Sequence, residues 1–318
     1  MNVRAIPRGE FEWINFIRSR LGSVHHGGQG IGDDAAILPS RLLWTTDALV
    51  EGVHFLSSWP MHGVGYKSLA CNVSDIAAMG GRPLYALLTT GLPPSYPPQK
   101  YADFLEGFKQ ALDDFDIDLM GGDTVRSNDA FFSISLLGEV IRRPLLRSGA
   151  QVNDFIYVSG YLGESSLGLQ TLLEKIPPSQ TSDLWVKRHL YPEPRLSLIG
   201  WLSEHFTITA AIDCSDGFLA DLEHIAEESQ KGYEIYLDKL PTPRGITMPN
   251  NWQETPWEFV FAGGEDYEII FTSPNILPSE GEGIPITCVG KIIENDFRLL
   301  WKNTPLPREA VPRGFTHF

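Results

Sequence analysis

The chain has 318 residues, 42% of them hydrophobic and 20% charged, and its formal net charge is −15 at pH 7. This length favours two domains, and the acidic charge argues against binding to nucleic acid or to an anionic membrane surface. Three well-separated cysteines, the lack of a continuous apolar segment in the first 20 residues, and no apolar run near the ~18 residues of a membrane span together predict a cytoplasmic protein.

Helical and strand patterns alternate along the chain. The first half predicts helices over 9–20, 66–79 and 99–115, and strands over 35–38, 42–46, 84–92, 117–120 and 131–140. An interruption near 141–153 predicts a boundary between domains at 1–145 and 146–318. The second half predicts helices near 164–174, 195–206 and 218–229, and strands over 155–159, 210–213, 235–237, 267–272 and 286–291. This alternation predicts the mixed α/β class.

Acidic motifs associated with glycine recur, most of them at the ends of predicted strands. They are Gly32-Asp33-Asp34 with Thr45-Thr46-Asp47, Asn72-Val73-Ser74-Asp75, Gly121-Gly122-Asp123-Thr124, Asp213-Cys214-Ser215-Asp216-Gly217 and Gly263-Gly264-Glu265-Asp266. Carboxylate and hydroxyl oxygens suit Mg²⁺, and glycine turns let a phosphate approach the backbone N–H groups. The recurrence predicts a site that brings metal ions and phosphates together.

Each motif taken alone also has a structural interpretation. Aspartates are common in turns and helix N-caps, and Asp75 suits the solvated face of a helix. His54 suits a packed histidine, and Arg147 suits a basic surface. The sequence has no P-loop and no kinase-type glycine loop, so an enzyme acting on ATP would hold the nucleotide in another way.

In their order along nearly the whole chain, these motifs resemble the thiamine-monophosphate kinase family. Its superfamily also contains aminoimidazole ribonucleotide synthetase, selenophosphate synthetase and the hydrogenase maturation factor HypE. Three segments point to the thiamine branch: Gly52-Val53-His54-Phe55, Arg147-Ser148-Gly149-Ala150 and Gly263-Gly264-Glu265-Asp266-Tyr267-Glu268. The resemblance implies transfer of the γ-phosphate of ATP to thiamine monophosphate, which gives thiamine diphosphate and ADP. It also implies a two-domain architecture like that of aminoimidazole ribonucleotide synthetase, in a homodimer whose N-terminal domains pair across the two-fold axis.

The resemblance also implies roles for individual residues. The implied ligands of several Mg²⁺ ions are Asp34, Thr45, Thr46, Asp47, Asp75, Asp123, Asp213 and Asp216. The implied contacts to ATP are Gly122, Arg147 and Ser215, and those to thiamine monophosphate are His54, Glu265 and Phe315. No general acid or base is assigned, because a phosphate monoester with a second pKa of about 6 is already largely ionised at neutral pH.

Two alternatives remain open. A sister enzyme would form ADP and phosphate from a formylglycinamidine-type ribonucleotide and would ignore thiamine monophosphate. A non-catalytic acidic protein would bind Mg²⁺ or Ca²⁺ without turning over ATP. Arg147, His54 and Phe315 speak against the second alternative, because a cation buffer has no use for them.

Overall fold

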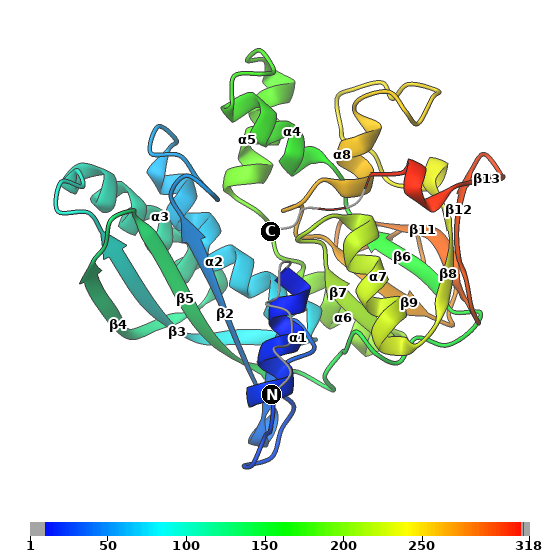
Figure 1. Cartoon of the computed structure of the whole chain (residues 1–318), viewed down its shortest axis with the longest axis horizontal. Coiled ribbons are helices and arrows are strands. Elements are labelled where there is room, and N and C mark those ends of the chain that lie inside the picture. Colours follow the sequence, from blue (N-terminus) through cyan, green and yellow to red (C-terminus); the bar gives the residue numbers. More distant parts are fainter. Residues whose placement is uncertain (1–9, 313, 315–318) are drawn as a thin grey trace, which may run out of the picture.

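Two mixed sheets organise the chain in this computed structural model, which describes residues 10–312 and 314 (Figure 1). The first sheet has five strands in the order β1-β2-β5-β3-β4. The second has eight, in the order β13-β12-β8-β11-β6-β9-β7, with β10 paired to β11. The mixed α/β class is confirmed. The sheets are joined by the segment between β5 and β6, whereas the division at residues 145 and 146 stays a prediction.

The elements of the first half agree well with the predicted ones. Its helices are α1 (Glu10–Leu21), α2 (Met61–Ala78) and α3 (Pro98–Phe115). Its strands are β1 (Ala36–Leu38), β2 (Leu42–Val50), β3 (Gly81–Leu92), β4 (Asp118–Arg126) and β5 (Phe131–Val140). Helix α2 begins five residues before its predicted start at 66, directly after its N-cap residue Pro60. Proline is tolerated at the start of a helix because its missing N–H group would have no partner within the helix there.

The second half contains more elements than the sequence predicted. Its helices are α4 (Glu164–Leu172), α5 (Gln180–Leu190), α6 (Leu196–His205), α7 (Phe218–Ser229) and α8 (Trp257–Ala262). Its strands are β6 (Phe155–Ser159), β7 (Ala210–Asp213), β8 (Gly232–Tyr236), β9 (Ile269–Ser273), β10 (Glu280–Gly281), β11 (Ile284–Ile293), β12 (Phe297–Trp301) and β13 (Thr304–Leu306). The prediction missed α5, α8, β10, β12 and β13.

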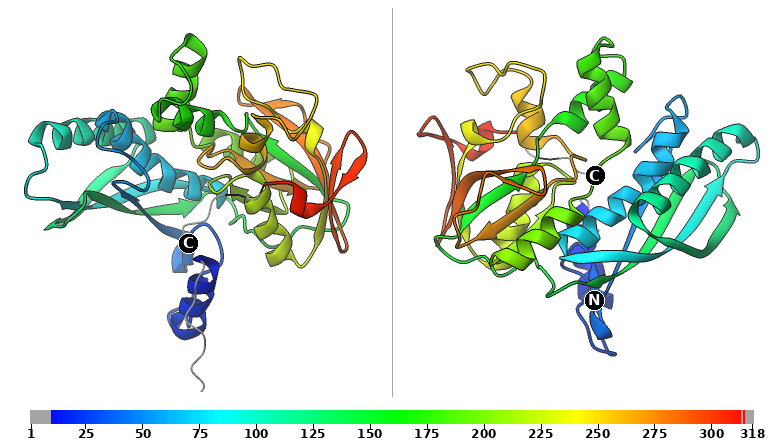
Figure 2. Two further views of the ribbon diagram at one scale, coloured as in Figure 1. Left: turned by 45° about the horizontal axis from the view of Figure 1, so that its top comes forward. Right: turned by 180° about the vertical axis from the view of Figure 1, so that it is seen from behind.

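Helix α2 is the common support of both halves. Together with α3 it covers one face of the five-stranded sheet (Figure 2), and it also contacts β7, α5 and α6 of the second half. Nearly all of its residues are buried, including the polar Ser68 and Asn72. These polar side chains therefore face the protein interior, where buried polar groups need partners.

The prediction that Gly121-Gly122-Asp123 follows a strand is wrong, because β4 continues through these residues. Strand β4 is an edge strand that pairs in parallel with β3, and all of its residues are exposed. At Gly122 φ is +155°, and a Cβ there would lie 1.7 Å from the carbonyl oxygen of Leu88. The close approach of the two strands thus requires glycine at this position, whatever else the residue does.

Candidate active site

Five predicted metal ligands lie together where the first sheet, α2 and the second sheet meet. One comes from the segment between α1 and β1, one from β2 and one from α2. The other two come from the end of β7 and from the loop after it. Each acts electrostatically on at least one of the others. We call this group the acidic cluster, and its members are Asp34, Asp47, Asp75, Asp213 and Asp216.

Two hydroxyl groups hold parts of the acidic cluster in place. The hydroxyl of Thr45 donates to Asp75 Oδ2 at 2.6 Å, and the hydroxyl of Ser74 donates to Asp213 Oδ2 at 2.7 Å. Because Ser74 lies on α2 and Asp213 ends β7, the second bond joins the two halves of the molecule across the site.

Burial makes the acidic cluster costly in the absence of cations. Burial, reinforced by neighbouring carboxylates, raises the pKa of Asp75 and of Asp213 well above the ordinary value. Burial also raises the pKa of Asp47 to about 6, with further contributions from Asp216 and Asp34. In addition, Oδ2 of Asp34 is buried without a hydrogen-bond partner. Carboxylates in this situation ionise together only when positive charge compensates them.

The acidic cluster fits Mg²⁺ in the manner in which this ion usually binds. Within residues 10–312 and 314, no three acidic, histidine or cysteine side chains converge to hold one ion by themselves. Magnesium commonly takes only one or two protein carboxylates and completes its octahedron with water and substrate phosphates. The orphaned oxygen of Asp34 is a ready ligand of that kind.

Arg147 lies beside the acidic cluster at the edge of a cavity of about 930 Å³. Its Nε and Nη2 donate to Asp34 Oδ1 at 3.0 and 2.5 Å, and its backbone N–H donates to Asp33 Oδ1 at 2.7 Å. Although burial disfavours its charge, Asp34 keeps the pKa of Arg147 above the ordinary value. The cavity, which Thr45 and Thr46 also line, has the size of a site for a small-molecule ligand.

Two of the predicted substrate contacts, His54 and Glu265, lie near each other. His54 follows the C-terminal end of β2, and Glu265 lies in the loop formed by Gly263–Glu268. His54 accepts the N–H of Val50 on Nδ1 at 3.0 Å, so the neutral ring carries its proton on Nε2. Burial works against the charge of Glu265, but the ammonium group of Lys67 lowers the pKa of its carboxyl, and His54 lies close enough to interact with it electrostatically. The backbone N–H of Glu265 donates to the carbonyl of Ser215 at 2.7 Å. Phe315 lies outside the described residues.

Three predicted site residues, two metal ligands and one ATP contact, are not brought to the acidic cluster within the single chain. The side chain of Thr46 is exposed on the opposite face of β2 from Thr45, and its hydroxyl donates to the carbonyl of Ile134 at 2.8 Å. Gly122 and Asp123 lie on β4, three strand positions from β2 in the sheet, which corresponds to about 14 Å. The roles of Thr46, Gly122 and Asp123 remain predictions.

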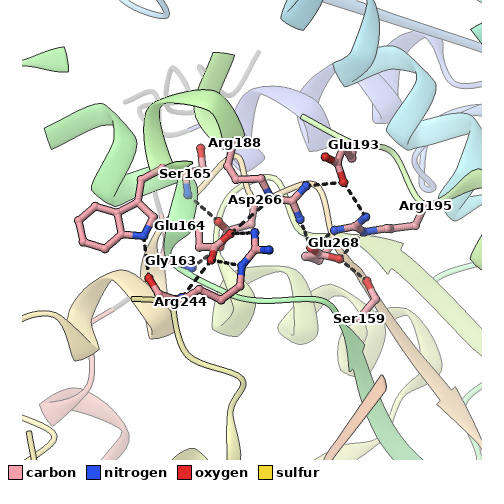
Figure 3. Close-up of polar contacts among 11 residues, drawn as sticks. Ser159, Gly163, Glu164, Ser165, Arg188, Glu193, Arg195, Arg244, Asp266 and Glu268 are labelled. Carbon is pink, nitrogen blue, oxygen red and sulfur yellow. Dashed lines mark hydrogen bonds and ion pairs between the residues drawn. The ribbon is translucent and has the colours of Figure 1, made fainter. Parts of the chain in front are cut away.

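Buried hydrogen bonds and ion pairs hold the Gly263–Glu268 loop in place (Figure 3). Asp266 accepts the backbone N–H groups of Gly163 and Ser165, at 2.6 and 3.0 Å, at the start of α4. Glu268 is fully buried and accepts Nε of Arg195 at 2.6 Å. Removing one partner of such a pair is expensive, because a charge then stays buried without compensation.

The basic partners of this loop were not predicted from the sequence. They come from α2, α5 and the segment after α5, and they are Lys67, Arg188, His189 and Arg195. One signal was available, since Lys67 is the single lysine or arginine of α2, a mostly apolar helix, and charged groups are buried only with a partner. Helix α5 itself was signalled by Ser179, which caps it reciprocally with Ser182.

The N-terminal half matches a known domain family. Residues 32–140, which contain the five-stranded sheet and three members of the acidic cluster, match the AIR synthase related protein, N-terminal domain. This part of the chain therefore contains the N-terminal domain of an AIR synthase-related protein.

Relatives that match over nearly their full length identify the family within this class. The chain is 33% identical to thiamine-monophosphate kinase of Aquifex aeolicus, over 99% of this chain and 100% of the relative. It is 34% identical to that of Bacillus subtilis, over 97% and 99%. The solved structure "AaThiL complexed with AMPPCP and TMP" superposes with a TM-score of 0.83 at 32% identity, over 98% of this chain and 97% of that chain. The chain belongs to the thiamine-monophosphate kinase family.

Proposed function

We propose that the chain transfers the γ-phosphate of ATP directly to thiamine monophosphate, which yields thiamine diphosphate and ADP. The observation that supports this most is the acidic cluster, whose buried carboxylates and orphaned Asp34 oxygen call for several cations at one place. The relatives named thiamine-monophosphate kinase, and the related structure complexed with AMPPCP and TMP, support the same reaction and both substrates. A cytoplasmic location belongs to the proposal; none of the described helices has the length and hydropathy of a membrane span.

The proposed roles divide the site into three parts. The acidic cluster, with Thr45, would hold Mg²⁺, which when bound neutralises phosphate charge and orients ATP for in-line attack. Thr46, on the opposite face of β2, would contribute only with a second subunit on that face. Arg147, Ser215 and Gly122 would contact the nucleotide, and Arg147 suits a phosphate because its planar guanidinium binds two oxygens at once. His54, Glu265 and Phe315 would contact thiamine monophosphate. No side chain need accept a proton from the attacking phosphate oxygen.

A homodimer is part of the same proposal. The face of the first sheet that α2 and α3 leave uncovered exposes large apolar side chains, among them Trp44 (49% exposed), Tyr85 (43%) and Leu87 (43%). Trp44 and Tyr85 both pair with Leu137 of β5, so the apolar side chains form a row across three strands. Contiguous apolar surface of this kind commonly marks a subunit interface. A second subunit on this face would also approach Thr46.

The proposed dimer would allow Asp123 to contribute in trans. Asp123 lies on exposed edge strand β4 and is about 14 Å from β2 of its own chain. A two-fold axis places equivalent surfaces of both subunits against each other, so β4 of one subunit can lie against β2 of its partner. We therefore propose that Asp123 and Gly122 act in the site of the partner subunit.

The first prediction concerns the reaction itself. We expect purified protein with Mg²⁺ and ATP to release ADP at a rate that thiamine monophosphate stimulates, with one thiamine diphosphate formed per ADP, as chromatography would measure. Because transfer is direct, γ-³²P from ATP should appear in thiamine diphosphate without labelling the protein. A labelled protein that turns over to product would contradict direct transfer. ADP release that thiamine monophosphate does not stimulate would favour a sister enzyme.

The second prediction concerns metal ions. We expect EDTA to abolish turnover and Mg²⁺ to restore it, with the rate still rising after the Mg²⁺ concentration exceeds that of ATP. The reason is that one ion accompanies ATP whereas the acidic cluster offers carboxylates for others. Initial rates at fixed ATP and increasing Mg²⁺ measure this, with ionic strength held constant. A plateau at one Mg²⁺ per ATP would argue against several ions.

A further inference from the structure

Lys67 is a buried cation to which the proposed reaction gives no role. It lies on α2, its side chain is 3% exposed, and its Nζ is 2.7 Å from Oε1 of Glu265 and 3.3 Å from Nε2 of His189. Burying an ammonium group is unfavourable unless partners compensate it. The pairing with Glu265 therefore explains the presence of Lys67 in this interior.

The contacts of Lys67 also determine where the proton of His189 lies. An ammonium group donates hydrogen bonds and accepts none, so Nε2 of His189 accepts and Nδ1 carries the proton. Burial first, and then the charge of Lys67, lower the pKa of His189 to about 3, so the ring is neutral. Its Nδ1 lies 3.0 Å from Oγ of Ser165, whose backbone N–H donates to Asp266. Lys67 thus begins a polar chain that reaches both Glu265 and Asp266.

The loop that Lys67 contacts has an unusual backbone. Glu265 and Tyr267 have φ of +64° and +51°, in the left-handed region that residues other than glycine seldom adopt. Helix α2 contacts both: Lys67 pairs with Glu265, and the thiol of Cys71, one turn later, donates to the hydroxyl of Tyr267 at 2.9 Å. Strained residues persist where surrounding contacts fix them, commonly at functional sites.

The two sides of the Glu265 carboxylate differ in exposure. Lys67 and His189 lie on its inner side and are 3% and 1% exposed, whereas the side chain of Glu265 is 27% exposed. Both carboxylate oxygens thus have a partner on the inner side, Lys67 at 2.7 Å from Oε1 and His189 at 3.5 Å from Oε2, while part of the Glu265 side chain remains exposed.

We propose that Lys67 is a positioning residue, which holds Glu265 so that the exposed part of its carboxylate receives the cationic thiamine portion of the substrate. The inference rests on the proposed function, in which Glu265 contacts thiamine monophosphate. It adds that the N-terminal half, through α2, sets the geometry of a substrate contact that belongs to the C-terminal half.

The test is a double-mutant cycle on steady-state kinetics. We expect Lys67→Met to raise the KM for thiamine monophosphate by about 10–100-fold, the range associated with loss of one charge-assisted hydrogen bond. The KM for ATP should change by less than about 2-fold, because Lys67 contacts no ATP residue. In a Glu265→Gln background, Lys67→Met should change the KM for thiamine monophosphate by less than about 2-fold, because both changes remove one interaction.

The controls separate positioning from folding. Lys109→Met removes an exposed ammonium that pairs with Asp113 at 2.7 Å, and it should leave both KM values unchanged. If Lys67→Met does not fold, the double variant, which leaves no unpaired charge, is compared with Glu265→Gln. Independent, multiplying effects on KM, or equal rises for both substrates, would overturn the inference. A wild-type protein that is inactive with thiamine monophosphate would instead overturn the proposed function.

Discussion

Asp47→Asn should lower thiamine diphosphate formation by about 10²–10³-fold and at the same time stabilise the metal-free protein. The loss of activity follows from removing one preorganised charged group at the site of transfer, an effect of this size in other enzymes. The gain in stability follows from repulsion, because burial, Asp216 and Asp34 raise the pKa of Asp47 to about 6. Relative to an ordinary aspartate pKa of about 3.8, this corresponds to at most about 3 kcal/mol of unfavourable free energy on folding.

The sign of the pH dependence is fixed by the same shift. A carboxyl group whose pKa is higher in the folded protein opposes folding once it ionises. The stabilisation by Asp47→Asn should therefore be absent below pH ~4, grow between pH ~4 and ~6, and be complete above pH ~6. Thermal unfolding in EDTA at pH 4.5 and at pH 7.5 measures it, as a shift of a few degrees.

Asp103→Asn is the matched control for this experiment. Asp103 is an exposed aspartate on α3 that accepts a hydrogen bond from Nε2 of Gln99 at 2.8 Å. Its replacement by Asn changes the net charge as much as Asp47→Asn does, but leaves the acidic cluster intact. It should alter neither activity nor the melting temperature. A destabilised Asp47→Asn protein in EDTA would contradict the repulsion, and full activity would remove Asp47 from the metal site.

Local acidic motifs predicted a metal and phosphate site, and the family resemblance implied which aspartates form the acidic cluster. The clearest motif combines an element end with adjacent acidic residues: Asp213 stands at the end of β7, whose bounds were predicted correctly. Likewise, the helix after it was predicted over 218–229, as observed for α7. Where the functional side chains and the secondary structure are both encoded within a few neighbouring residues, a single amino-acid sequence is enough to locate that part of a site.

The features that were missed depend on contacts between distant residues. Lys67 meets Glu265 only after α2 has packed against the second half, and no local pattern encodes that pairing. Similarly, β4 continues through Gly122 because it pairs with β3, and this pairing overrides the turn tendency of glycine. Strand order cannot be deduced from local propensity, so the distance from Asp123 to the acidic cluster was not predictable either.

Mixed dimers should reveal whether Asp123 acts in the partner's site. Asp47→Asn and Asp123→Asn homodimers should each be nearly inactive. If Asp123 acts in trans, a mixed dimer has one site with both changes and one site with neither. Random mixing makes about half of the dimers mixed, so about 25% of wild-type activity should return. Mixing by reversible unfolding or by co-expression, with light scattering to verify the dimer, measures this recovery.

The matched control pairs Asp47→Asn with Asp75→Asn. Both residues belong to the acidic cluster of one chain, since Thr45 of β2 bonds directly to Asp75. Every site in that mixed dimer carries one of the two changes, so no activity should return. Recovery in the first mixture alone would show that each site combines Asp47 of one subunit with Asp123 of the other. Equal recovery in both mixtures, or none in either, would contradict a shared site, and a monomer in solution would leave Asp123 without a route to the acidic cluster.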